Sequence, residues 1–120
     1  MKVFKIECNV FKFDVLIVAN CTHEELKTFL KKQYRVSLDD SPDINTIGGM
    51  YTVEKNPWRV VWVKDWKDRS CLIHELFHLT TRVCNDRGIQ IVSHDEKGNV
   101  ADEAAAYLME FLVTQCLKRK

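Results

Sequence analysis

The sequence predicts an α+β fold, with a small and mostly antiparallel sheet of about four to five strands packed on about three helices. Alternating apolar and charged residues mark strands near the start and middle of the chain, and three other segments repeat apolar residues at helical spacing. The length of 120 residues suits one domain, which we expect to span residues 1–120. Hydrophobic residues make up 46% and charged residues 29%, which favours a folded domain over a disordered chain.

Two strands are expected at the start of the chain. Phe4 and Ile6 alternate with Lys5 and Glu7, and the same alternation recurs over residues 11–17. Because only residues 8–10 separate the two, we expect a hairpin.

The first helix is predicted over residues 22–33. Thr22 and Glu25 form a capping-box pattern, which marks a helix start. Leu26, Phe29 and Leu30 then recur at helical spacing, so this helix should cover the sheet with one face.

A loop and a second hairpin are expected in the middle of the chain. Residues 37–49 are rich in Asp, Ser, Pro, Asn and Gly, and they fail the calcium-loop pattern because Ile44 stands where the turn glycine belongs. Residues 50–54 and 58–64 are β-rich, with a turn at residues 55–57. In the second of these strands Trp58, Val60 and Trp62 share one face and valines the other, which predicts a strand covered on both sides.

Two longer helices are expected in the second half. Residues 68–87 are apolar almost all round, which predicts a largely buried helix with Gly88 as its C-cap. Residues 89–92 suggest a short extended piece and residues 93–99 a polar loop. A last helix is predicted over residues 100–117.

Charge and cysteine usage exclude several function classes. A net charge of +1 gives no electrostatic reason to expect nucleic acid or an anionic membrane as a partner. No run of apolar residues is long enough for a membrane span, and the first residues lack the pattern of a signal peptide. Five cysteines at scattered positions favour reduced core thiols over a disulfide framework, so we expect a cytoplasmic protein.

The chemistry is expected in an HExxH motif at residues 74–78. His74 and His78 lie four residues apart in a predicted helix, so both imidazoles can reach one metal ion. Glu75 lies beside that position, where a general base for metal-bound water belongs. The alternative is that the two histidines bond to local carbonyls, but burying this set on an apolar helix is costly unless something such as a metal satisfies it.

A catalytic zinc needs a third protein ligand, and Glu103 is the preferred candidate. It opens the last helix and is followed by three alanines, which would allow close packing against the histidine helix. An acid in a first helical turn is also favoured by the helix dipole. Asp102, His94 and Glu110 remain as rivals, and Glu110 is also a candidate second-shell partner.

Cys71 precedes His74 by about one turn, so a structural zinc site formed by Cys71, His74 and His78 is an alternative. Three ligands along one straight helix span too much length for a tight tetrahedral site. This structural-zinc arrangement is therefore the weaker hypothesis.

The HELFH run at residues 74–78, followed by DEAAAYL at residues 102–108, resembles the gluzincin class of zinc metallopeptidases. The compact form is similar to small metallopeptidase-like proteins of bacteriophages and mobile elements, including the repressor-cleaving type. The resemblance covers about the second half of the chain and implies a minimal zincin-like fold. It also implies that an edge strand before the HExxH helix, here residues 51–54 or 60–64, pairs with an extended substrate.

The expected function is therefore a zinc metallopeptidase that hydrolyses a restricted protein or peptide substrate. His74, His78 and Glu103 would bind Zn²⁺, and Glu75 would act as the general base. Tyr107 and His94 are weak candidates for stabilising the oxyanion or for second-shell roles. Two alternatives stay open: a non-catalytic zinc-binding regulatory module, and a metal-free interaction domain.

Overall fold

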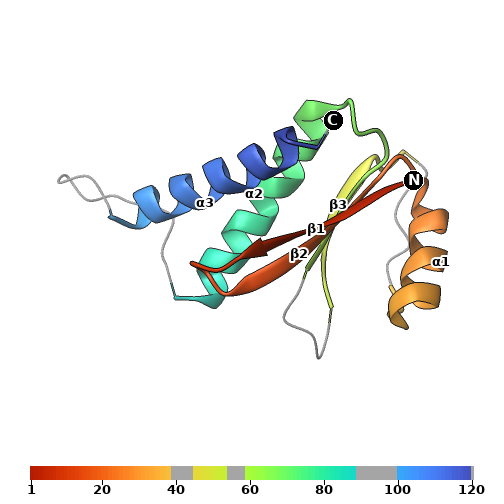
Figure 1. Cartoon of the computed structure of the whole chain (residues 1–120), viewed down its shortest axis with the longest axis horizontal. Helices are drawn as coiled ribbons and strands as arrows, with labels where there is room; N and C mark the ends of the chain where they lie inside the picture. The colour runs from red at the N-terminus through yellow and green to blue at the C-terminus, as the bar shows by residue number, and fades with distance from the viewer. Residues whose placement is uncertain (39–44, 54–58, 89–99, 120) are drawn as a thin grey trace.

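The computed structural model describes residues 1–38, 45–53, 59–88 and 100–119. Over these residues the chain forms three helices and a four-stranded mixed sheet, so the predicted α+β class is confirmed (Figure 1). The elements follow in the order β1 (Lys2–Cys8), β2 (Phe13–Ala19), α1 (His23–Tyr34), β3 (Gly48–Thr52), β4 (Arg59–Val63), α2 (Arg69–Asp86) and α3 (Val100–Leu117).

The sheet order is β1-β2-β4-β3, which places β1 and β3 at its edges. β1 and β2 pair antiparallel along their whole length, which confirms the first hairpin. β3 and β4 also pair antiparallel, whereas β2 and β4 run parallel, so the connection through α1 crosses from one half of the sheet to the other.

Two strand boundaries differ from the prediction. β2 begins at Phe13 because Lys12 has a left-handed φ of 56°, which places it in the turn. β3 begins at Gly48, so both glycines of the predicted loop belong to the strand. The predicted turn at residues 55–57, the extended piece at 89–92 and the polar loop at 93–99 lie outside the described residues.

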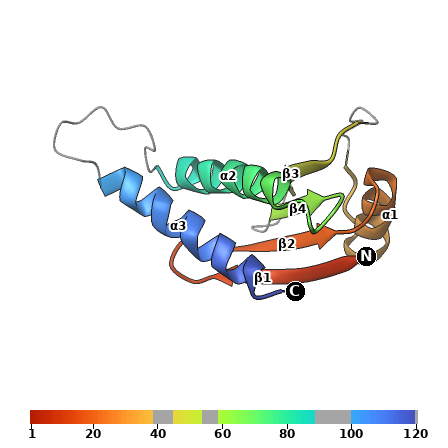
Figure 2. The ribbon, with the colours of Figure 1, turned by 90° about the horizontal axis from the view of Figure 1, so that it is seen from above.

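Helices cover both faces of the sheet (Figures 1 and 2). α2 and α3 pack on one face, where the valines of β4, Val61 and Val63, join the core. α1 packs on the other face, against Val60 and Trp62. The prediction that this strand is covered on both sides is therefore confirmed, and the five buried, unpaired cysteines are core residues.

The first helix has the expected cap. Thr22 accepts a hydrogen bond from the backbone N–H of Glu25 at 3.2 Å, and Glu25 accepts one from the backbone N–H of Thr22 at 3.0 Å. This reciprocal pair satisfies two of the free N–H groups at the helix start. It fixes α1 directly after β2.

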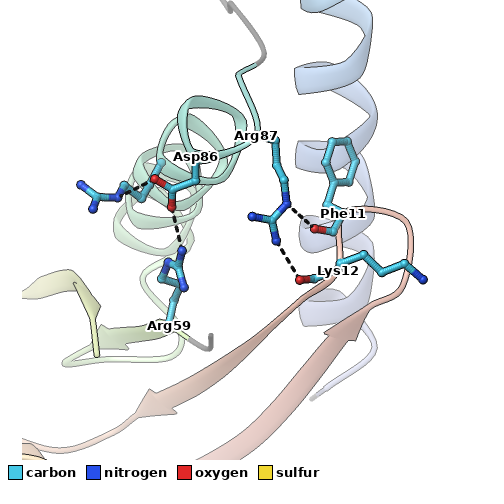
Figure 3. Close-up of polar contacts among 6 residues, drawn as sticks. Phe11, Lys12, Arg59, Asp86 and Arg87 are labelled. Carbon is cyan, nitrogen blue, oxygen red and sulfur yellow. Dashed lines mark hydrogen bonds and ion pairs between the residues drawn. The ribbon is translucent and has the colours of Figure 1, made fainter. Parts of the chain in front are cut away.

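Polar contacts hold the C-terminal end of α2 on the sheet (Figure 3). Arg87 donates to the backbone carbonyls of Phe11 at 2.9 Å and Lys12 at 2.8 Å, in the β1–β2 turn. Asp86 pairs with Arg59 of β4 at 2.7 Å. Gly88 follows with a φ of +72°, as expected for the glycine that ends a helix. α2 is thus fixed at the end farthest from its HExxH motif.

None of the helices seen in the described residues has the length and apolar character needed to cross a membrane.

Candidate metal centre

Helix α2 brings the two histidines of the HExxH motif together. The Nε2 atoms of His74 and His78 lie 3.0 Å apart, and the rings meet edge to face. Both side chains are exposed, whereas the helix buries the opposite side in the core. The imidazoles therefore form a pair of nitrogen ligands that solvent can reach.

The spacing of the pair fits one metal ion. Two nitrogens bound to zinc at about 2.0–2.1 Å and a tetrahedral angle lie about 3.3 Å apart. The 3.0 Å separation of the Nε2 atoms is close to this value, and two exposed rings can adjust by the small difference. The same distance also suits a hydrogen bond in which one ring donates to the other.

Glu75 adds a buried carboxylate to the pair. The residue is only 6% exposed, and its Oε1 lies 3.8 Å from Nε2 of His74. Its Oε2 is buried and has no hydrogen-bond partner among the described residues. Burial raises the pKa of this carboxyl, and the neighbouring His74 and His78 only partly offset the effect.

A buried carboxylate with one unpaired oxygen is costly for the fold. The ligand atoms of His74, Glu75 and His78 all lie within 4.8 Å of one another. An ion held by the imidazoles, or a water bound between them and the carboxylate, would satisfy this oxygen. The donor set is thus chemically suited to a divalent cation.

A cleft of about 490 Å³ opens beside Glu75, between the start of α2 and the chain that leads into β3. Asp68 lies at its helical end, where its carboxylate caps α2 by accepting from the backbone N–H of Cys71 at 3.1 Å. The lining consists of Asn45, Thr46, Ile47, Gly48, Asp68, Ser70, Cys71, His74 and Glu75.

One side of this cleft is formed by residues 45–47 and by Gly48, the first residue of the edge strand β3. β3 pairs with β4 on one side only in the described sheet, and Lys64 donates to the carbonyl of Ile47 at 2.8 Å. Because hydrogen-bonding direction alternates along an antiparallel pair, Gly48 and Met50 direct their backbone groups away from β4. Of the two segments predicted as the edge, 51–54 and 60–64, the first overlaps β3 at residues 51–52 and is therefore at the edge of the described sheet, whereas β4 lies inside it.

Glu103 does not join the cluster. It is exposed, and it lies seven residues before Glu110, which is also exposed, so both point from the same face of α3. The opposite face, with Leu108, Leu112 and Cys116, packs into the core against α2. The predicted third ligand is therefore directed away from the histidines in this structure.

The packing register of the two helices separates Glu103 from the pair as well. α2 and α3 run in opposite directions (Figures 1 and 2), and Thr80 contacts Met109 at 3.5 Å. Glu103 precedes Met109 by six residues and His78 precedes Thr80 by two, which places them about 12 Å apart along the helix axes. A glutamate side chain does not span that distance.

The remaining predicted residues lie outside the cluster or outside the description. Tyr107 is 54% exposed on α3. His94 and the side chain of Asp102 are outside the described residues. Cys71 is buried and donates to the carbonyl of Ile47 at 3.4 Å, and burial is the main cause that raises the pKa of its thiol. It does not belong to the group of metal-ligand atoms that includes His74.

Sequence reasoning missed the cleft wall, because residues 45–48 were expected to be part of a solvated loop. The available signal was the Gly48–Gly49 pair next to a β-rich run, since glycine in a strand often marks a close approach of another segment. Comparison with family models, with curated proteins and with solved structures returned no match, so the function is argued from this site.

Proposed function

We propose that this protein is a zinc-dependent metallopeptidase that hydrolyses a restricted protein or peptide substrate. The observation that carries the proposal is the buried Glu75 carboxylate, which has an oxygen without a partner among the described residues. It lies next to the His74 and His78 pair and lines a cleft at the start of the edge strand β3. Each part has a place in metal-assisted peptide hydrolysis, and together they give a general base, two metal ligands and a substrate platform.

His74 and His78 would hold the zinc. When bound, the ion would supply a Lewis acid that polarises the substrate carbonyl and makes water more acidic. Of the four candidates for the third ligand, Glu103 and Glu110 are directed away, and His94 and Asp102 stay predictions.

Glu75 would move the proton. Its carboxylate takes a proton from the water as the water oxygen bonds to the peptide carbonyl carbon, and it gives that proton to the leaving nitrogen as the peptide C–N bond breaks. Burial raises its pKa from the ordinary value toward neutrality, which makes the carboxylate a stronger base and the carboxylic acid still a competent donor. The 6% exposure of this residue also keeps bulk water from competing for the proton.

The substrate would lie along β3. Gly48 and Met50 direct backbone N–H and C=O groups to the side of β3 that has no partner strand in the described sheet, so an extended peptide could add there as a further strand. A peptide in that position passes over the mouth of the cleft, next to Glu75. The small number of loops around the cleft favours one restricted substrate over broad digestion.

The test incubates the zinc-loaded protein, or its Glu75→Gln variant, with a cell lysate whose proteins serve as substrates. New N-termini are counted by mass spectrometry. We expect the wild type to cleave and the variant to cleave at least about a hundredfold more slowly. Both proteins should contain the same amount of zinc. Stoichiometric zinc without any protein cleaved would contradict the proposal.

A second candidate is a non-catalytic zinc-binding module, which the position of Glu103 favours. If His74, Glu75 and His78 are the ligand set, all three groups bind the ion and no base remains. Glu75→Gln would then weaken zinc binding, whereas in a peptidase it leaves zinc binding unchanged. Equilibrium titration with zinc therefore separates the two functions.

A further inference from the structure

The edge strand approaches the HExxH helix closely at Gly48. A Cβ atom built at this position would lie 2.6 Å from Sγ of Cys71, 3.0 Å from the carbonyl oxygen of Trp62 and 3.2 Å from Cγ of Glu75. Gly48 has no left-handed φ, because among the described glycines only Gly88 has one. Space, and not backbone conformation, therefore requires glycine here.

These neighbours leave the extra atom no free direction. The carbonyl of Trp62 belongs to β4, which pairs with β3 and stops the strand from moving back. Cys71 is buried, with its thiol bonded to the carbonyl of Ile47, so its sulfur cannot swing into solvent. The side chain of Glu75 has more rotatable bonds than that of Cys71, so it is the neighbour that can yield most readily.

We propose that Gly48 is a positioning residue for Glu75: the missing side chain lets the free sheet edge close against this carboxylate and holds it beside the histidine pair. The inference rests on the proposed function, in which Glu75 is the base. It also accounts for the burial of Glu75, which is only 6% exposed although it lies beside an edge strand.

The displacement expected from one methyl group is a few tenths of an ångström, since the Cβ to Cγ approach of 3.2 Å must lengthen to an ordinary contact. A misplacement of about 1 Å can cost about a hundredfold in rate. We therefore expect Gly48→Ala to lower kcat about tenfold and to change KM less than threefold. The histidine nitrogens lie outside this contact, so zinc affinity should stay within twofold.

Gly49→Ala is the matched control. A Cβ at Gly49 would meet only the ring of Tyr51, at 2.6 Å from its hydroxyl oxygen, on the opposite face of the same strand. It adds the same atom to the same element without touching Glu75. We expect it to lower the melting temperature but to leave kcat within twofold of the wild type.

If Gly48→Ala does not fold, the same comparison is made on a Cys71→Ala background. That change removes the sulfur at 2.6 Å but leaves the contact with Glu75 at 3.2 Å. Gly48→Ala with Cys71→Ala should then melt near Cys71→Ala alone and still show the lower kcat.

Thermal unfolding in chelator gives a readout without metal or activity. Gly48→Ala should lower the melting temperature less in a Glu75→Ala background than in the wild type, because the Cγ atom is gone, whereas Gly49→Ala should lower it equally in both. Additive shifts at positions 48 and 75, or equal kcat in Gly48→Ala and the wild type, would overturn the inference. A wild type that cleaves nothing refutes the proposed function alone, since the unfolding cycle still reports on Gly48.

Discussion

Removing the charge of Glu75 should stabilise the metal-free protein. The residue is 6% exposed and its Oε2 has no partner among the described residues. A buried, unsatisfied polar group costs about 1–3 kcal/mol, and an ionised one costs more. Glutamine keeps the shape and the need for hydrogen bonds but loses the charge, so we expect Glu75→Gln to raise the free energy of unfolding by about 1–2 kcal/mol at pH 7.5.

This gain converts to a measurable shift in melting temperature. The unfolding entropy of a chain of 120 residues is about 0.25 kcal/mol per kelvin, so the shift should be about 4–8 °C. The assay is thermal unfolding followed by circular dichroism in excess chelator. Glu110→Gln is the control. Glu110 is exposed on α3, so removing its charge should change the melting temperature little.

The pH dependence has a defined sign. The folded pKa of Glu75 is raised, so the folded state holds its proton to a higher pH than the unfolded state does. The carboxyl therefore costs no stability below its unfolded pKa of about 4.5, and the cost grows as the pH rises through the folded pKa. The advantage of Glu75→Gln should vanish near pH 4. Equal melting temperatures at pH 7.5, or an advantage unchanged at pH 4, would refute this account of a destabilising base.

Three further predictions concern the metal and the frame that holds α2. Zinc at a hundred times its dissociation constant should stabilise the wild type by about 2.7 kcal/mol, or about 10 °C, and His74→Ala or His78→Ala should abolish this shift in a zinc titration followed by thermal unfolding. Glu103→Ala should leave the same zinc-dependent shift intact because its side chain points away from the histidines, and a lost shift would mean that α3 repacks when zinc binds. Arg87→Ala should lower the melting temperature by about 8 °C, since it removes two hydrogen bonds to turn carbonyls at about 1 kcal/mol each. Arg35→Ala, which leaves the hairpin contacts in place, provides the comparison.

Of the predicted site, the pairing of the two histidines could be predicted from the sequence, whereas the position of Glu103 could not. The spacing of His74 and His78 predicted that both rings reach one point, and their nitrogens lie 3.0 Å apart. The same reasoning placed Glu103 in the cluster because three alanines follow it. Placing Glu103 required knowledge of how α3 packs against α2. Leu108 and Leu112 determine this packing, because they lie on the face of α3 that enters the core.

The strands also divide into features that the sequence predicted and features that only the structure shows. Alternation in residues 58–64 predicted a strand covered on both faces, and β4 is the inner strand with Val61 and Trp62 on opposite sides. The glycine pair in residues 48–49 was expected in a loop because glycine is common in turns. The pair belongs to β3 because it pairs with β4, and at Gly48 the close approach of α2 leaves no room for a side chain.

The sequence by itself determined the local features: the capped first helix, the alternating strands, and an HExxH helix whose histidines share one face. These depend on bonds and angles within a few residues, which helical and strand periodicity describe well. Only the tertiary structure decided that β3 is the edge beside Glu75, that this carboxylate is buried without a full set of partners, and that Glu103 faces solvent. Those facts depend on how distant segments pack against one another, and a one-residue change in that packing turns a side chain from the core to the surface.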